Sequence, residues 1–165
     1  VTNDEDLAHQ LRLLRQHGQT SKYAHAIVAY NFRLEEIQAA VLNVKLAYLD
    51  KWNNGRRECA GRYNELLSDT GLVLPREMEY ARHVYHVYAV QCDSRDELQN
   101  RLAAKGIQTG VHYPIPIHLQ PAYASLGYKA GDLPVTERLS EHVLSLPLFA
   151  ELTDAQQLAV VDAIR

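Results

Sequence analysis

The chain has 165 residues, of which 47% are hydrophobic and 22% charged, and its formal net charge is −3. This length fits one domain with a core of ordinary size, and the composition is typical of a soluble globular protein. Lysine and arginine are spread along the chain without a run, which argues against nucleic acid as the main partner. A membrane span would need about eighteen consecutive apolar residues, and the sequence contains no such stretch.

Cysteine usage and the start of the chain carry two further expectations. Cys59 and Cys92 are far apart and have no metal-binding spacing, so we expect reduced thiols in a cytoplasmic protein. The sequence has no initiator methionine, and its single methionine is Met78. We therefore expect the chain to be part of a longer protein.

The first predicted helix covers residues 2–18. Thr2 and Glu5 could form a capping box, and Gly18 is a typical stop signal. Three leucines recur at helical spacing: Leu7, Leu11 and Leu14. Residues 19–30 show no clear period and are predicted to be a loop.

The most informative element is a long helix predicted to begin near Arg33. Its apolar residues recur every three or four positions, at Leu34, Ile37, Val41, Val44 and Tyr48. A helix this apolar needs other protein surface packed against most of its circumference. Asn53, Asn54 and Gly55 weaken the pattern, which resumes at Cys59 and ends before Gly71. We therefore expect one bent helix or two nearly collinear ones.

Two polar residues lie just ahead of this helix. Asn31 is placed to cap it, because its side-chain oxygen can accept from a free backbone N–H. Arg33 has no obvious carboxylate nearby, so its donors could face an anion or simply the solvent.

The rest of the sequence predicts a compact α/β unit. The β-branched and aromatic run of residues 84–92 is the strongest strand signal in the chain. Further strands are expected at residues 72–74, 107–111 and 143–149. Helices are expected at residues 94–105, 120–126, 136–142 and 153–164, the last capped by Thr153. Two helices followed by such a unit suggest a piece of a two-domain protein.

Residues 112–118, with the sequence H-Y-P-I-P-I-H, form a second informative stretch. The prolines fix φ and stiffen the loop, which could present His112, Tyr113 and His118 in a fixed array. A connector whose rings cover the core is an equally simple interpretation. A zinc site using His112 and His118 would need a third ligand that the sequence does not mark. No Gly-rich phosphate loop, G-x-S-x-G elbow or catalytic Cys–His signature is present.

Three stretches together resemble one family. They are residues 1–18, 30–42 and 106–123, and L-S-L-P-L-F at residues 144–149 adds to them. They are similar to the DegT/DnrJ/EryC1/StrS sugar aminotransferases, which use pyridoxal 5′-phosphate (PLP) on nucleotide-linked keto-sugars. The resemblance covers essentially the whole chain, with the motifs in the family's order.

The resemblance implies an α/β fold of the aspartate-aminotransferase type (fold type I), of which this chain would be the C-terminal part. Residues 1–30 would end the large cofactor-binding domain, and residues 31–70 would form the long interdomain helix. Residues 71–165 would be the small α/β domain, with a mostly antiparallel sheet. The resemblance also implies a homodimer with active sites shared between subunits.

Site residues follow from the same resemblance. Asn31 matches the asparagine that reaches the cofactor phosphate from the neighbouring subunit, and Arg33 matches an arginine suited to an anionic substrate or an ion pair. His112, Tyr113 and His118 match the loop that lines the sugar-nucleotide site. The family usually has glycine where this chain has Ala29.

The largest departure from the family is an absence. The lysine that forms the Schiff base with PLP lies upstream of the first motif in the family and is not in this sequence. The resemblance therefore implies that the intact protein transfers an amino group, with glutamate as the implied donor, to a nucleotide-linked keto-sugar. This chain alone is expected to be inactive. The alternative is a free-standing, non-catalytic domain that binds a sugar nucleotide or pairs with a PLP-bearing subunit.

Overall fold

A computed structural model describes residues 1–165, the whole chain. The chain divides into two compact units, Val1–Tyr48 and Leu49–Arg165, which we call the first and the second unit. Each unit is described by itself. No helix in either unit has the length and apolar character needed to cross a membrane.

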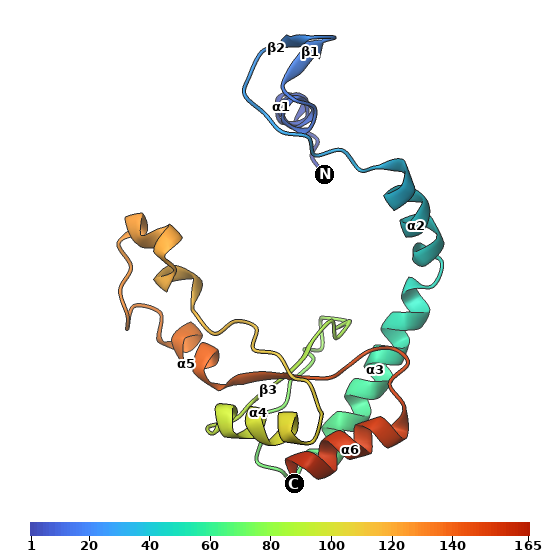
Figure 1. Cartoon of the computed structure of the whole chain (residues 1–165), viewed down its shortest axis with the longest axis vertical. Coiled ribbons are helices and arrows are strands. Elements are labelled where there is room, and N and C mark those ends of the chain that lie inside the picture. The colour runs from blue at the N-terminus through green and yellow to red at the C-terminus, as the bar shows by residue number, and fades with distance from the viewer. The chain divides into compact units, whose positions relative to one another are not determined.

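The first unit consists of two helices and a small hairpin (Figure 1). Its elements are α1 (Glu5–Arg15), β1 (Gln19–Ser21), β2 (Ala24–His25) and α2 (Glu36–Leu46). The predicted capping box at Thr2 is wrong, because Asp4 caps α1 and accepts from the Leu7 N–H at 3.0 Å. Gly18 does help to end the helix, since its N–H donates to Leu13 O at 2.7 Å with a positive φ of 68°.

The long helix begins later than predicted. Glu35, not Asn31, is the N-cap of α2, and its backbone N–H donates to the Gln38 side chain at 3.4 Å. Asn31 is unavailable as a cap because it pairs with Gln16 in an isolated antiparallel bridge beside the end of α1. No residue of α2 is buried, and its predicted apolar stripe is exposed at Leu34, Ile37, Val41 and Val44.

The predicted weak point at residues 53–55 is also wrong. Helix α2 ends at Leu46, and α3 (Leu49–Leu66) runs through these residues without a break. Two of them, Asn54 and Gly55, have tertiary contacts that the sequence does not reveal. The Asn54 side chain accepts from Arg82 at 2.7 Å, and a Cβ at Gly55 would lie only 2.7 Å from the carbonyl oxygen of Ala150. Glycine is thus required there by a close backbone approach.

The second unit is an α/β unit around a short antiparallel sheet (Figure 1). After α3, its elements are β3 (Tyr88–Gln91), α4 (Arg95–Ala104), η1 (Ile117–Leu119), η2 (Pro121–Leu126), α5 (Pro134–His142), β4 (Val143–Leu146) and α6 (Asp154–Ile164). Strands β3 and β4 pair from Tyr88↔Leu146 to Gln91↔Val143. Two isolated antiparallel bridges, Val73↔Gln91 and Gly110↔Ser145, extend this pairing. The mostly antiparallel character is therefore as predicted, although the expected strands at residues 72–74 and 107–111 shrink to single bridges.

Only part of the strongest predicted strand is extended. Of residues 84–92, β3 contains Tyr88–Gln91 alone. Tyr85 has a positive φ of 48°, which breaks the extended backbone before the sheet begins. Side chains from α3 hold this irregular segment, since Arg56 donates to Val84 O at 3.2 Å and Arg57 donates to His83 O at 2.7 Å.

The core of the second unit lies between the sheet and its helices. Its fully buried side chains include Tyr63, Leu67, Tyr88, Val90, Leu102, Leu144 and Val161. Helix α6 packs against α3 and α4, and Thr153 caps it as predicted. The two buried tyrosines keep their hydroxyls paired: Tyr63 donates to Pro147 O at 3.1 Å and Tyr88 to Asn64 Oδ1 at 2.6 Å. Burial raises the pKa of both phenols, so they remain neutral donors.

Candidate functional site

Asn31 and Arg33 are positioned by the chain returning along the end of α1. The Tyr30 N–H donates to Leu14 O at 3.2 Å, and the Phe32 N–H donates to Arg15 O at 2.9 Å. These acceptors are carbonyls at the C-terminal end of α1, which have no partner within the helix. The backbone on either side of Asn31 is therefore fixed by hydrogen bonds.

The two side chains form an exposed set of hydrogen-bond donors. Asn31 Oδ1 accepts from Arg33 Nε at 3.0 Å and from the Arg33 backbone N–H at 3.5 Å. Asn31 is exposed and its oxygen is engaged, so its NH₂ group is left to bind a partner outside this pair. Arg33 forms no ion pair with a carboxylate, so the outer nitrogens of its guanidinium also face solvent. An amide NH₂ beside an unpaired guanidinium is suited to a phosphate or carboxylate.

His112 and Tyr113 lie in the second unit at the rim of a cavity of about 270 Å³. His112 Nδ1 is hydrogen-bonded to Ser145 Oγ on β4 at 2.9 Å, which fixes the imidazole. A Cβ at Gly110 would lie 2.6 Å from the His112 ring, so glycine makes room for it. Tyr113 is 73% exposed and meets His112 edge-on, with ring centroids 5.7 Å apart.

The cavity lies between residues 112–117 and α5. Its loop wall includes Ile115 and Ile117, and its other wall includes Thr136 and Leu139. The lining is mainly apolar, with a few polar groups at the edge, as is usual for pockets that take an organic ligand.

His118 is placed differently from His112. Its side chain is buried, with 7% of the residue exposed, and it does not line the cavity. Its Nε2–H donates to the Glu137 carboxylate at 3.0 Å. The structure thus brings His112 and Tyr113 together at one cavity and turns His118 inward.

Neither His112 nor His118 belongs to a metal cluster. No group of three or more histidine, cysteine, aspartate or glutamate side chains is placed to hold a metal ion. The two imidazoles have Ser145 and Glu137 as partners instead.

Two residues that shape this region were missed by the sequence analysis. In the sequence, Glu137 is an ordinary acidic residue in the first turn of a helix. The structure shows that it accepts a hydrogen bond from His118. Ser145 could have been suspected, because it is a polar residue within the apolar run of β4.

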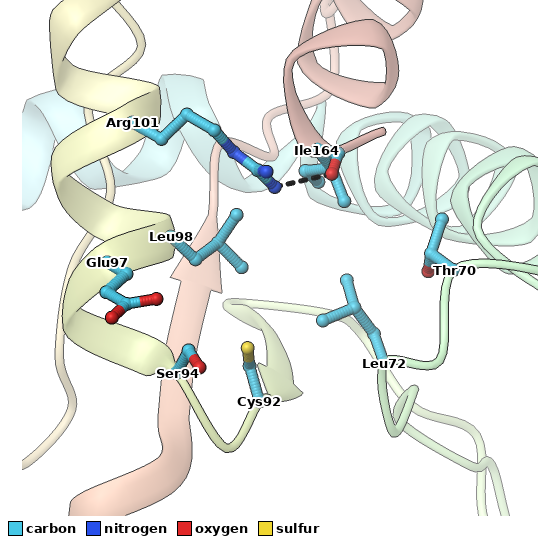
Figure 2. Close-up of a pocket in the computed structure, with 8 residues that line it drawn as sticks. All are labelled: Thr70, Leu72, Cys92, Ser94, Glu97, Leu98, Arg101 and Ile164. Atoms are coloured by element: carbon cyan, nitrogen blue, oxygen red, sulfur yellow. Dashed lines mark hydrogen bonds between the residues drawn. The ribbon is translucent and has the colours of Figure 1, made fainter.

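A second cavity, of about 280 Å³, lies elsewhere in the second unit and contains none of the predicted site residues (Figure 2). Arg101 from α4 points across it and donates to the carbonyl oxygen of Ile164 at 2.5 Å. Its guanidinium is thus used to tie α4 to the end of α6. The five lysines of the chain, Lys22, Lys45, Lys51, Lys105 and Lys129, are all exposed and line neither cavity.

The family follows from comparison with known proteins. The chain matches the model of the DegT/DnrJ/EryC1/StrS aminotransferase family over residues 1–165, and it belongs to that family. The predicted family is thereby confirmed.

Individual relatives add detail. The chain is 47% identical to a pleiotropic regulatory protein of Geobacillus stearothermophilus, over 99% of this chain and 45% of that protein. It is 44% identical to the dTDP-3-amino-3,4,6-trideoxy-α-D-glucose transaminase of Streptomyces venezuelae, over 100% of this chain and 44% of that protein. The chain thus spans less than half the length of these curated relatives.

Several solved structures are also similar to this chain. The S. venezuelae protein DesV, in complex with a ketimine intermediate, matches with a TM-score of 0.90 and 44% identity, over 100% of this chain and 45% of that one. NtdA of Bacillus subtilis, with bound cofactor PMP, matches with a TM-score of 0.83 and 29% identity, over 99% of this chain and 40% of that one. The predicted α/β fold of the PLP-dependent aminotransferases is confirmed by these matches.

Proposed function

We propose that this chain is part of a PLP-dependent aminotransferase that moves an amino group from a donor, with glutamate as the candidate, to a nucleotide-linked keto-sugar. The observation that carries the proposal is the donor set of Asn31 and Arg33, whose outward N–H groups have no partner in the first unit. The 44% identity to a dTDP-amino-sugar transaminase supports the substrate class.

The residues present fit the phosphate end of PLP. The Asn31 NH₂ group would donate to a phosphate oxygen, and its fixed backbone would hold that donor in place. Arg33 would neutralise an anionic group nearby, either the phosphate or the substrate. PLP, when bound, would carry the amino group between donor and acceptor. No lysine of this chain lies at either described cavity, so we propose that the chain alone does not catalyse the transfer.

His112 and Tyr113 are the proposed contacts to the sugar nucleotide. The fixed imidazole of His112 and the exposed phenol of Tyr113 would hydrogen-bond polar groups of the ligand, and the apolar walls of the cavity would exclude water. His118, which the resemblance assigns to the same site, would act there indirectly, because its ring is buried.

We further propose the domain assignment given by the resemblance: residues 1–30 in the large domain, 31–70 as the link and 71–165 as the small domain. The division between the compact units after Tyr48 falls within the proposed link and supports it. A homodimer is supported by the exposed apolar stripe of α2, which needs a cover. A cytoplasmic location is supported by the free thiols of Cys59 and Cys92.

A chimera tests the proposal directly. The segment of the S. venezuelae transaminase that matches this chain is replaced by residues 1–165, and amino transfer from glutamate to a dTDP-linked keto-sugar is measured. The account predicts a chimera that binds PLP and transfers the amino group. A chimera that binds PLP but transfers no amino group to any nucleotide-linked keto-sugar tried would contradict the proposed activity.

The non-catalytic alternative predicts different solution behaviour. A domain built to stand alone should be monomeric and stable in water. A chain with an exposed apolar stripe on α2 should self-associate as its concentration rises, which sedimentation velocity measures directly.

A further inference from the structure

One carboxylate in the second unit joins three separate segments. Glu137 lies in the first turn of α5 and accepts the Nε2–H of His118 from η1 at 3.0 Å. It also accepts the Gly131 N–H at 2.8 and 3.0 Å and the Leu133 N–H at 3.1 Å, both from the turn before α5. We call this arrangement the Glu137 hub. These donors hold the pKa of Glu137 below its ordinary value, the Gly131 N–H most strongly, so the carboxylate stays ionised at neutral pH.

The hub is the only polar anchor of the His118 ring. His118 is buried, and its Nδ1 has no hydrogen-bond partner within the chain. The bond from Nε2 to Glu137 is therefore the only hydrogen bond of the ring. The Tyr128 ring meets the imidazole edge-on at 6.1 Å between centroids. Nε2 carries the proton that Glu137 accepts, so loss of this bond would leave the buried ring without a polar partner in the chain.

The hub also connects the two walls of the 270 Å³ cavity described above. His112 and Tyr113 lie at the rim of this cavity. His118 directly follows Ile117 of the loop wall, and Glu137 lies between Thr136 and Leu139 of the α5 wall. The 3.0 Å bond between them therefore fixes the separation of the walls from behind. Without it, the loop would be held on that side by apolar contacts alone, which are less directional.

We infer that Glu137 is a positioning residue: acting through His118, it sets the width of this cavity and the placement of His112 and Tyr113. The inference rests on the proposed function only for the identity of the ligand, a nucleotide-linked sugar. Glu137 itself does not touch that ligand. Its loss should therefore weaken ligand binding through misplacement of the loop and leave the helices of the second unit folded.

The test compares variants of the 165-residue chain by NMR and calorimetry. Glu137→Ala removes the acceptor, and Glu137→Gln keeps an oxygen for His118 but loses the charge. Glu141→Gln is the matched control, because Glu141 lies one turn further along α5, is exposed, and its side chain makes no hydrogen bond or ion pair. Ring signals of His112, Tyr113 and His118 report the placement of the loop, and dTDP-glucose is the binding probe.

The inference predicts that Glu137→Ala shifts the ring signals of His112 and Tyr113 and removes the Nε2–H signature of His118. Affinity for dTDP-glucose should fall about tenfold or more, with a smaller loss in Glu137→Gln and none in Glu141→Gln. If Glu137→Ala does not fold, the graded effect in Glu137→Gln decides the matter. Unchanged His112 and Tyr113 signals in a folded Glu137 variant would overturn the inference. If the wild-type chain does not bind dTDP-glucose, the proposed ligand is at fault, and the ring signals still decide whether Glu137 positions the loop.

Discussion

The two units of this chain differ in how they bury apolar surface. The second unit closes a core of its own, with Tyr63, Tyr88 and Leu102 inaccessible to water. In the first unit only Gly18 is buried, and α2 exposes its whole apolar stripe. The second unit can thus draw its stability from internal packing, whereas the first must draw on contacts outside itself.

The same contrast holds for polar groups. In the second unit, the Glu137 carboxylate and the Tyr88 hydroxyl find hydrogen-bond partners within the unit. In the first unit, Asn31 and Arg33 are exposed, and the N–H groups that they do not use for their mutual bond have no partner. The lesson is that partners and ligands are to be sought where a unit leaves its own groups unsatisfied.

The largest predicted effect is on the core of the second unit. Leu102→Ala should lower the free energy of unfolding by about 2–5 kcal/mol, because a fully buried leucine leaves a cavity behind. Urea denaturation followed by circular dichroism gives the value. A loss below about 1 kcal/mol would mean that this core is not closed.

Acid should weaken the second unit through its paired carboxylates. Arg57 holds the pKa of Glu77 below its ordinary value, and Arg165 does the same for Asp69. A carboxyl group with a lowered pKa in the folded state stabilises that state at neutral pH, and the contribution disappears as the pH falls through the folded pKa. The urea midpoint should therefore decrease from about pH 7 towards pH 3. Glu77→Gln should flatten that profile, and an unchanged slope would contradict the assignment.

A smaller loss is expected when a buried hydroxyl is removed. Tyr63→Phe should cost about 1 kcal/mol, because Pro147 O loses its donor while the ring stays packed. The unfolding free energies of Tyr63→Phe and Tyr63→Ala separate the hydrogen bond from the ring. Equal losses in the two variants would show that packing of this ring contributes nothing.

The smallest effect on stability is expected on α2. Val41→Ser should change the free energy of unfolding of the isolated chain by less than about 0.5 kcal/mol, because Val41 is exposed. Sedimentation should show weaker self-association, since an apolar contact is lost. If Val41→Ser lowered the free energy of unfolding as much as Leu102→Ala does, the two units would not differ in how they bury apolar surface.

The sequence predicted the elements whose signals are local. The cap of α6 and the apolar stripe of α2 follow from residue spacing along one helix, and the structure contains both. The family motifs predicted the family, which was confirmed over residues 1–165. The proposed roles of Asn31, Arg33, His112, Tyr113 and His118, and the domain boundaries, stay predictions.

Apart from the cap of α1, where Asp4 takes the place of Thr2, the failures share one physical cause, which is pairing between residues distant in the sequence. Asn31 does not cap α2 because Gln16 pairs with it, and Asn54 and Gly55 lie within an unbroken α3, where Arg82 and Ala150 contact them. The bond between His118 and Glu137 joins residues that lie 19 positions apart and in different elements, η1 and α5. No single-sequence pattern predicts such contacts, so the inward orientation of His118 could not be foreseen.

The most direct test of the account is the affinity of the chimera for PLP when Asn31 is changed to aspartate. This variant keeps an oxygen that accepts from Arg33, so the local structure should persist, but it replaces the outward NH₂ donor with a negative charge. If the donor faces the cofactor phosphate, PLP affinity should fall about tenfold or more, because a charge-assisted hydrogen bond becomes a repulsion. An Asn31→Asp chimera that binds PLP as tightly as the parent would contradict the claim that this donor set is the anion site.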